Sequence, residues 1–337
     1  MKADNYSAWD INPKNFPSNG TMREQLLFIA GYGVLAPSTH NSQPWKVELG
    51  ESSITLRPNM EVANRLKQVD PQYRQLGISL GSFVANVQIA AEYFGLSVTK
   101  QYAFKTFESG SVVMIFKKKL PNKEYYSLVQ AMPKRRSNKS MYTEEPLSDE
   151  LRNKIATQNL KIIEENQDKQ KLAELYLGAA KEFSTRPFTE ELVSWMRPPD
   201  TRAYDGMPSS VQGMKKAQFI VGRFLMPRVP KLLEKVAQAD HLKIINSSGI
   251  AIVYSDHDGL VDWVKAGEAM ERFILTCIAS GLNVTIMQAA IESKGSRDKL
   301  PVYMSGKYPQ VFLRLGYATI KNAPHTPRKP LMSFIIE

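Results

Sequence analysis

Two stretches of the chain share one hydrophobic pattern. Residues 81–98 align without a gap with residues 267–284, and in each a mostly apolar segment of helix length lies between two glycines. Apolar residues on most sides predict buried helices rather than surface helices. The second glycine, Gly95 or Gly281, stands where a helix commonly ends in the left-handed conformation. The pattern therefore predicts two buried helices of the same kind, although chance similarity of two ordinary buried helices stays open on spacing alone.

Strand-like runs flank both of these helices. Residues 53–57 and 112–116 surround the first helix, and residues 249–254 and 311–315 surround the second. A Gly-Leu-x-Val sequence also begins a strand directly after each helix. Strand, buried helix and strand, repeated once along the chain, predict an α+β fold made of two related halves.

The two halves are separated by a segment that breaks the pattern. The pattern is interrupted near residues 118–134 by a run of three lysines that begins at residue 117, by Pro121 and by Pro133. Such residues commonly mark a connection between elements. We therefore expect a first half over residues 20–125 and a second half over residues 130–335.

The segment over residues 36–45 is too polar for a core. It follows a helical pattern over residues 24–34 and precedes a strand-like pattern over residues 46–49. Pro37 and Pro44 fix the backbone. Three short side chains can bond either a ligand or the backbone: Ser38, Thr39 and Asn41. A rigid polar turn of this kind suits the edge of a flat heteroaromatic ligand, and a plain connector between helix and strand is the alternative.

A second polar cluster, Arg-Arg-Ser-Asn-Lys, occupies residues 135–139. Alternate positions of an extended segment share a face, so Arg135, Ser137 and Lys139 are placed to converge on one anion. Arginine offers a planar fork for phosphate oxygens, and lysine offers a point charge. A late arginine, Arg328, lies between two prolines. A solvated basic loop is the alternative interpretation.

The net charge raises the question of nucleic-acid binding. The 337 residues include 44 Lys and Arg against 33 Asp and Glu, which gives a formal charge of +11. A nucleic-acid binder is expected to show a basic stripe with an entering helix or a stacking platform, and neither is recognisable in the sequence. An excess of positive charge also suits a protein that holds phosphates and attracts anionic ligands.

Other features of the sequence concern the compartment. No apolar run is long enough to cross a bilayer, and the first residues have no apolar signal region. The lone cysteine, Cys277, excludes an internal disulfide and fits a reducing compartment. We therefore expect a cytoplasmic protein with a small-molecule partner and with neither a nucleic-acid nor a membrane partner.

Several common site motifs are missing from the sequence. No Gly-x-Gly-x-x-Gly follows a strand, no P-loop is present, and no Gly-x-Ser-x-Gly elbow exists. The four histidines stand apart, so a metal site is poorly supported. Residues 256–258, Asp-His-Asp, are better explained as a turn than as a cation site. His40 is expected to be a surface histidine of its loop rather than a ligand contact.

The loop sequence carries a resemblance. Pro-Ser-Thr-x-Asn-Ser-Gln-Pro-Trp, over residues 37–45, resembles the signature of the FMN-dependent nitroreductase family. In that family the loop lies against the isoalloxazine ring. The resemblance therefore implies ring contacts by Pro37, Ser38, Thr39 and Asn41.

The basic cluster resembles the same family. Arg-x-Ser-x-Lys is similar to the segment with which nitroreductases hold the FMN phosphate, and Arg328 resembles their C-terminal phosphate contact. The resemblance thus implies phosphate contacts by Arg135, Ser137, Lys139 and Arg328, with Arg136 as a weaker candidate.

The arrangement of these motifs implies a fused protein. Members of the family are usually homodimers with FMN between the subunits, one of which supplies the phosphate clamp and the other the loop. Here the loop lies in the first half and the clamp in the second. The chain therefore looks like a tandem nitroreductase, a pseudo-dimer with one complete FMN site, and a further homodimer of fused chains stays open.

Two segments depart from the family pattern. A Pro-x-Glu-Gly-like turn often lies beside the ring after the second buried helix, whereas residues 285–290 here contain no glycine. Met287 and Gln288 are therefore the candidates for the contact near flavin N5. Residues 195–214 are rich in proline, methionine and aromatic residues, and we expect them to be ordered. A lid over the flavin and a packing role elsewhere are the two alternatives for this segment.

The resemblance implies an FMN-dependent NAD(P)H oxidoreductase that passes electrons to nitroaromatics, quinones or a similar acceptor. Because the flavin carries the difficult step, the protein needs no acid–base pair, and the sequence shows none. The alternative is a non-catalytic flavin-binding or flavin-storage protein whose lid blocks the nicotinamide.

Overall fold

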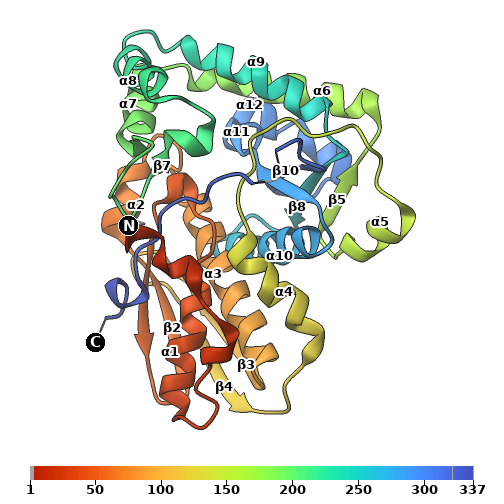
Figure 1. The fold of residues 1–337 in the computed structure, drawn as a ribbon. Helices are drawn as coiled ribbons and strands as arrows, with labels where there is room; N and C mark the ends of the chain where they lie inside the picture. Colours follow the sequence, from red (N-terminus) through yellow and green to blue (C-terminus); the bar gives the residue numbers. More distant parts are fainter. Residues whose placement is uncertain (1–3, 321, 337) are drawn as a thin grey trace.

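The computed structural model describes residues 4–320 and 322–336 (Figure 1). The predicted α+β class and the two related halves are confirmed. Each half contains a four-stranded antiparallel sheet and a long buried helix, and the two long helices pack against each other between the sheets.

The first half follows the predicted order of elements. Helix α1 precedes the first two strands, and helix α3 leads into the last two. The bounds are α1 Met22–Gly33, β1 Trp45–Leu49, β2 Ser53–Pro58, α2 Met60–Ala63, α3 Arg74–Tyr93, β3 Leu96–Ala103 and β4 Ser111–Lys118. The sheet order is β1-β2-β4-β3, with antiparallel neighbours throughout.

The second half repeats this plan and adds helices. Its sheet order is β5-β8-β10-β9, again antiparallel. The strands and the central helix are β5 Leu160–Ile163, β8 Gly249–Ser255, α10 Leu260–Ala279, β9 Asn283–Ile286 and β10 Tyr308–Gly316. The other helices are α4 Tyr126–Ala131, α5 Asp149–Ile155, α6 Asn166–Phe183, α7 Arg186–Trp195, α8 Lys216–Leu225, α9 Leu232–Ile245, α11 Ala289–Glu292 and α12 Lys294–Arg297.

The internal duplication extends to the ends of the central helices. Helices α3 and α10 have the same length and begin and end at equivalent positions of the gap-free alignment. Gly95 and Gly281, which follow them, have φ of 83° and 84°. This is the left-handed conformation predicted for both, and glycine adopts it without the steric cost that a Cβ would bring.

The first glycine of each pair lies within its helix and not at the start of it. Gly81 and Gly267 lie where α3 and α10 cross. A Cβ added to Gly81 would lie 1.8 Å from the carbonyl oxygen of Val264, and one added to Gly267 would lie 2.1 Å from that of Ile78. The two glycines therefore allow the backbones of the two halves to touch.

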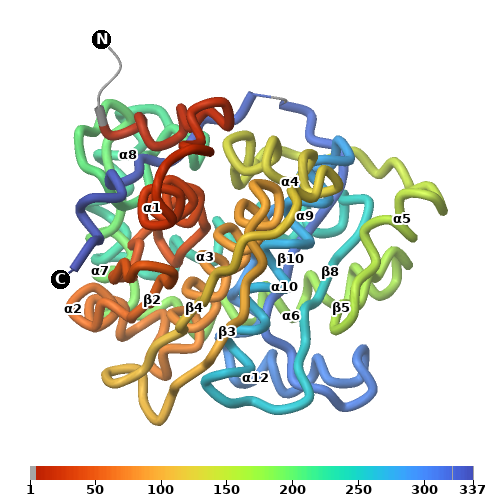
Figure 2. The backbone as a smooth tube through the Cα atoms, turned by 90° about the horizontal axis from the view of Figure 1, so that it is seen from below, coloured from red at the N-terminus to blue at the C-terminus, as the bar shows by residue number. Residues whose placement is uncertain are grey.

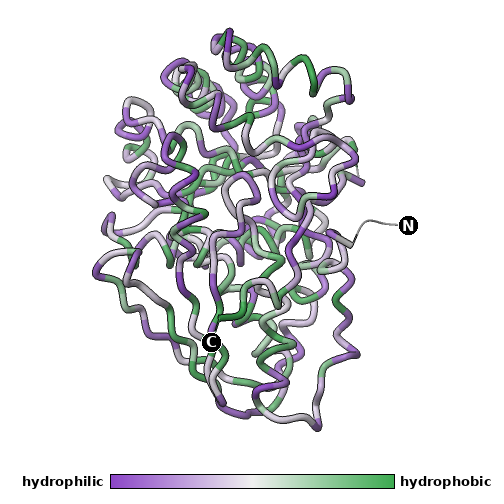
Figure 3. Tube along the Cα trace, turned by 90° about the vertical axis from the view of Figure 1, so that its left-hand side faces the viewer, coloured by the Kyte–Doolittle hydropathy of each residue, from purple (hydrophilic) through white to green (hydrophobic). Residues whose placement is uncertain are grey.

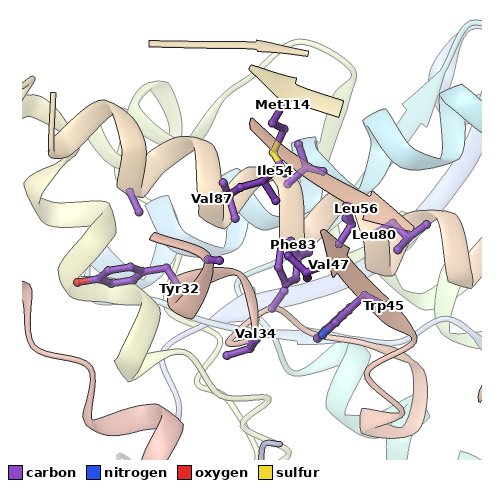
Figure 4. Packing of buried hydrophobic residues seen from close by; sticks show 14 of the residues in the cluster. Tyr32, Val34, Trp45, Val47, Ile54, Leu56, Leu80, Phe83, Val87 and Met114 are labelled. Atoms are coloured by element: carbon purple, nitrogen blue, oxygen red, sulfur yellow. The ribbon is translucent and has the colours of Figure 1, made fainter. Parts of the chain in front are cut away.

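A single apolar core fills the first half. Phe83 of α3 lies beneath the sheet, with its ring 5.4 Å from that of Trp45, and Leu56, Leu80 and other apolar side chains surround it (Figure 4). The core also contains Phe334 from the end of the chain, 5.9 Å from Trp45. The C-terminal segment thus packs on the sheet of the first half.

The C-terminal segment contributes to the joint between the halves. Ile335 forms a parallel bridge with Val47 of β1, and Figure 2 shows the C-terminal segment beside the first half. The junction expected near residues 118–134 is not a bare linker, because it contains α4, which packs against both α3 and α10. The predicted bounds of the halves stay a prediction.

Helices α6, α7, α8 and α9 of the second half lie at the top of Figure 1. Helices α6 and α9 pack side by side, and α7 and α8 lie next to them. Among the described residues, no helix has the length and the apolarity that a bilayer span requires. These helices matter for the site because they cover the cavity described next.

Candidate functional site

A cavity of about 390 Å³ lies between the two halves. This volume falls in the range of small-molecule sites in proteins, roughly 300–1,000 Å³. Every residue that the sequence singled out lines it: Pro37, Ser38, Thr39, Asn41, Arg135, Arg136, Ser137, Lys139, Met287, Gln288 and Arg328. The fold thus brings together residues from four separate parts of the sequence, while their roles toward a ligand stay a prediction.

The loop over residues 36–45 has an unusual backbone. His40, Asn41 and Gln43 have φ of 51°, 58° and 55°, and each such residue other than glycine costs roughly 1 kcal/mol or more. Inside the loop, the Ser38 hydroxyl accepts a hydrogen bond from the Gln43 N–H at 2.9 Å. A strained turn persists only where many contacts with the rest of the protein hold it, and the hydrogen bonds of Asn41 and Gln43 supply such contacts.

Two buried amides tie the loop to its neighbours. The Gln43 Nε2 donates to the carbonyl oxygen of Tyr204 at 2.8 Å, and its Oε1 accepts from the Lys329 N–H at 2.9 Å. The Asn41 Nδ2 donates to the carbonyl oxygens of Gly206 and Pro327 at 3.1 and 2.9 Å. Because both amides form hydrogen bonds with other segments of the protein, they join the loop to residues 195–214 and to the C-terminal segment.

Arg135 is buried at the junction of the halves. Its Nη2 donates to the carbonyl oxygen of Leu35, which follows α1 in the first half, at 2.7 Å. Its Nε lies 3.5 Å from Oε1 of Glu271 on α10, too poorly placed for a hydrogen bond. Burial lowers the pKa of the guanidinium, and Glu271 opposes this shift.

Arg328 is buried beside Arg135. Its guanidinium donates to Oδ1 of Asn41, to Oγ1 of Thr326 at 2.6 Å and to the carbonyl oxygen of Ala36 at 3.3 Å. It also lies 4.8 Å from the ring centre of Trp9, and the guanidinium of Arg135 lies 5.8 Å from the same ring. The N-terminal segment thus places an indole next to both cations.

The charges at this point of the cavity do not balance. Arg135 and Arg328 are both buried and face one buried carboxylate, Glu271, whose pKa burial raises to about 7 against the effect of the two arginines. The Nε of each arginine has no hydrogen-bond partner among the described residues. Both carboxylate oxygens of Glu271 also have no hydrogen-bond partner among the described residues. Two buried cations that line the cavity and face one carboxylate leave an excess of positive charge there, so the residues present fit the phosphate of FMN.

The remaining residues of the basic cluster also reach the cavity. The Lys139 Nζ donates to Oε1 of Gln212 at 2.6 Å, and the Arg136 Nη1 donates to the carbonyl oxygen of Ala323 at 2.7 Å. Asn138, between Ser137 and Lys139, points elsewhere and is buried. Arg135, Ser137 and Lys139 therefore line one cavity, as does Arg136, and their convergence on one anion stays a prediction.

His40 was expected on the surface of its loop, and this expectation is wrong. The side chain is partly buried and lines the cavity, and its Nε2 has no hydrogen-bond partner within the part of the chain that the structure describes. Burial lowers the pKa of His40 to about 4, with a further contribution from the positive charge of Lys139. The imidazole is therefore neutral at pH 7 and can accept or donate one hydrogen bond toward a ligand.

Met287 and Gln288 follow the end of β9 and line the cavity. The Gln288 side chain pairs with the edge of β10, accepting from the Phe312 N–H at 2.8 Å and donating to the carbonyl oxygen of Gln310 at 3.1 Å. This pairing extends the sheet without the glycine turn common in the family. A contact of either residue with flavin N5 stays a prediction.

The candidate lid, residues 195–214, is ordered by contacts on several sides. Trp195 is fully buried with Leu66 and Val69 of the first half, and the guanidinium of Arg65 lies 4.4 Å from its ring. The Asn5 Nδ2 donates to the carbonyl oxygens of Thr201 and Ala203 at 3.1 and 2.7 Å. Several lid side chains line the cavity: Met196, Met207, Val211, Gln212 and Met214.

Some cavity residues had no signal in the sequence. Trp9 lies before the first predicted element, and Gln75 lies in the first turns of α3, with an Nε2 that has no partner among the residues described. Glu292 lines the cavity at the end of α11, and burial raises its pKa to about 8, with contributions from Asp70 and Glu191. Carboxylates are seldom buried, and the sequence gives no sign that this one lies in a cavity, so Glu292 could be recognised only from the fold.

Residues 256–258 follow β8 in a bend, and the carboxylate of Asp258 has protein partners. Asp258 accepts hydrogen bonds from Arg297 at 2.8 and 2.9 Å and from the Trp263 indole at 2.7 Å. Within residues 4–320 and 322–336, no cluster of His, Cys, Asp and Glu has the arrangement of a metal site. Asp258 therefore serves the structure of the second half.

The two halves, the loop at residues 37–45 and the cations at residues 135–139 are similar to the parts of a fused nitroreductase, and sequence relatives carry a related name. Over 334 residues this chain is 25% identical to a Mycobacterium tuberculosis protein provisionally named NAD(P)H nitroreductase. The aligned region covers 95% of this chain and 92% of that relative. A second M. tuberculosis protein, uncharacterised, is 24% identical over 332 residues and covers 89% of each chain.

Solved structures with partial likeness carry related names. A provisionally named nitroreductase from Anabaena variabilis has a TM-score of 0.46 and 12% identity, over 93% of this chain and 91% of its own. The FMN-dependent nitroreductase NfnB from Mycobacterium smegmatis, solved with NADPH, has a TM-score of 0.40 and 13% identity, over 62% of this chain and 96% of its own. No family model matches the chain.

Proposed function

We propose that this chain is an FMN-dependent NAD(P)H oxidoreductase that passes electrons to an electron-poor acceptor such as a nitroaromatic or a quinone. The observation that carries the proposal is the buried pair of Arg135 and Arg328, which lines the cavity and faces one carboxylate, Glu271. A second support is the position of the nitroreductase-like loop on the same cavity.

The residues divide the work by position. Arg135 and Arg328 would hold the phosphate of FMN with charge-assisted hydrogen bonds, and Ser137, Lys139 and Arg136 would add donors. The loop from Pro37 to Asn41 would lie along the ring, held rigid by the ties of its amides to the lid and the C-terminal segment.

Bound FMN would supply the redox chemistry, since it accepts a hydride from NAD(P)H and returns electrons to a second substrate. The chain's own contribution is to bind and orient the cofactor in a cavity lined by lid methionines and by neutral His40.

An anaerobic flavin experiment tests the proposal. The purified protein is saturated with FMN, freed of excess FMN and mixed with NADPH or NADH while the visible flavin band is followed. Bleaching within seconds, reversed by a nitroaromatic or a quinone, is the expected result. Absence of any FMN binding in a fluorescence titration would overturn the assigned site, and binding without reduction would overturn the enzyme.

A flavin-storage function is the second candidate, favoured by the lid. Its backbone is tied to Asn5 on one side and to Asn41 and Gln43 on the other, and such ties leave little freedom for a nicotinamide to enter. The Asn5→Ala variant separates the two candidates, because Asn5 does not line the cavity. Reduction that occurs only in this variant would favour storage, whereas equal reduction in both proteins would favour the enzyme.

A further inference from the structure

Helices α8 and α9 expose large apolar side chains to solvent. Their exposed fractions lie between 43% and 58%, although a surface helix normally presents polar residues on that side. We call this surface the α8–α9 face, and its apolar members are Ile220, Val221, Phe224, Val229, Val236 and Leu242. Figure 1 shows both helices at the top of the molecule, far from the sheet of the first half.

Helix α8 is apolar on two opposite sides. Phe219 and Met226 point inward and are buried with Val193 and Met196. Ile220 and Phe224, one turn apart, point outward. The inner side accounts for the attachment of the helix to the protein, so the outer side needs a separate explanation.

The α8–α9 face is also strongly basic. Residues 215–236 contain six Lys and Arg and a single acid, Glu234. The basic residues are exposed: Lys215, Lys216, Arg223, Arg228, Lys231 and Lys235. Figure 3 shows hydrophobic and hydrophilic residues mixed along the helices at the top of the molecule. The guanidinium of Arg228 lies 3.8 Å from the ring centre of Phe224, so the two kinds of side chain share one surface.

We propose that the α8–α9 face docks on the surface of an anionic lipid bilayer. A helix that combines exposed apolar residues with lysines and arginines is typical of segments that lie in the membrane interface, with the apolar side chains among the acyl chains and the cations at the headgroups. This peripheral mode differs from the expectation of no membrane partner, which rested on the lack of a spanning run.

The charge pattern argues against a second copy of the chain as the partner. A symmetric dimer through this face would bring the same surface of both copies together. The six cations of one copy would then face the six of the other, with Glu234 as the one acid of this segment to offset them. Like charges at such an interface are unfavourable, whereas an anionic bilayer complements them.

The position of the face relative to the cavity supports an outward-facing role. Met226, Leu233 and Ala237 line the cavity from the inner side of the same segment. Val236 lines the cavity and is also 43% exposed. The cavity therefore approaches the surface at α9, within the face that we assign to the bilayer.

Vesicle sedimentation tests the docking and needs no flavin activity. The full chain is mixed with vesicles of phosphatidylglycerol and phosphatidylcholine in equal parts, and in parallel with vesicles of phosphatidylcholine alone. We expect binding to the anionic vesicles that falls with added salt, and little binding to the neutral ones. No binding to anionic vesicles at low salt would overturn the proposal.

Two double variants identify the surface. The first, Ile220→Ser with Phe224→Ser, removes apolar side chains from the face. The control, Ile320→Ser with Leu120→Ser, removes side chains that are 59% and 87% exposed elsewhere. Because each apolar group of this size contributes strongly when buried, the first variant should bind anionic vesicles about tenfold more weakly or worse. The control should bind as wild type does.

Two outcomes would contradict the assignment of the face. Equal loss of binding in both double variants would show that the bound surface lies elsewhere. Concentration-dependent dimers that only the first variant abolishes, together with absent vesicle binding, would show that a second copy covers the face. Circular dichroism and the melting temperature of both variants establish that each is folded before it is compared.

Discussion

The contact between Gly81 and the backbone of α10 allows a quantitative prediction. In a Gly81→Ala variant the new Cβ would lie 1.8 Å from the carbonyl oxygen of Val264 and 2.9 Å from the amide nitrogen of Glu268. Carbon and oxygen atoms in close but allowed contact are roughly 3.3 Å apart. The two helices must therefore separate by roughly 1.5 Å, because neither neighbour is the flexible end of a side chain.

The magnitude follows from two opposing effects. Overpacking of a well-packed core typically costs about 1–3 kcal/mol, and a clash with backbone belongs at the upper end or beyond. Alanine in place of glycine in a helix stabilises it by about 1 kcal/mol. We therefore expect Gly81→Ala to lower the free energy of unfolding by about 2 kcal/mol or more.

A matched control makes the reasoning testable. Gly178 lies in the interior of α6, is exposed and would have no atom within 4 Å of an added Cβ. Gly178→Ala should therefore stabilise the protein by about 0.5–1 kcal/mol. Urea denaturation of the three proteins, followed by circular dichroism, measures both changes. If Gly81→Ala is as stable as Gly178→Ala, the close crossing of the halves is refuted.

The same substitution has a second expected effect. The cavity is lined by both halves, so a separation of α3 from α10 should move the loop away from Arg135. FMN affinity should therefore fall in Gly81→Ala and stay unchanged in Gly178→Ala. Unchanged affinity in both variants, with the loss of stability present, would show that the crossing does not control the spacing of the site.

Three other predictions concern the site. Arg135→Lys should weaken FMN binding about tenfold or more in a fluorescence titration, because the fork to the phosphate is lost. Arg297→Lys, at an arginine that pairs with Asp258 and does not line the cavity, should change FMN binding little. Glu292 has a folded pKa of about 8, above that of the unfolded chain. The folded state therefore holds an extra proton, and stability falls as the pH rises through this interval. The fall in urea midpoint between pH of about 5 and 8 should be smaller in Glu292→Gln, and an unchanged slope would contradict the raised pKa. Gln43→Glu loses the donor to Tyr204 and should speed proteolysis within residues 195–214; an unchanged cleavage rate would show that this tie does not hold the lid.

The sequence by itself determined the repeated plan of the fold. Apolar residues around a helical stretch require burial on several sides, and this signal is local, so it located both central helices and the strands beside them. The glycines at positions 95 and 281 were predicted correctly because a left-handed helix end depends on the residue and its neighbours alone.

The sequence also selected the residues of the site, through the resemblance of two short motifs. Both motifs consist of residues that lie close along the chain, which is why they were visible before the fold was known. Their meeting in one cavity, and with it the burial of His40, depended on how the two halves pack.

The tertiary structure alone decided the contacts between distant segments. Trp9 beside Arg328, Glu271 opposite Arg135, and Phe334 against Trp45 join residues far apart in the chain. The same holds for Gly81, whose lack of a side chain matters only because Val264 lies against it. Such pairs leave no periodicity in the sequence, because each partner is chosen by the packing of whole helices and sheets rather than by its neighbours along the chain.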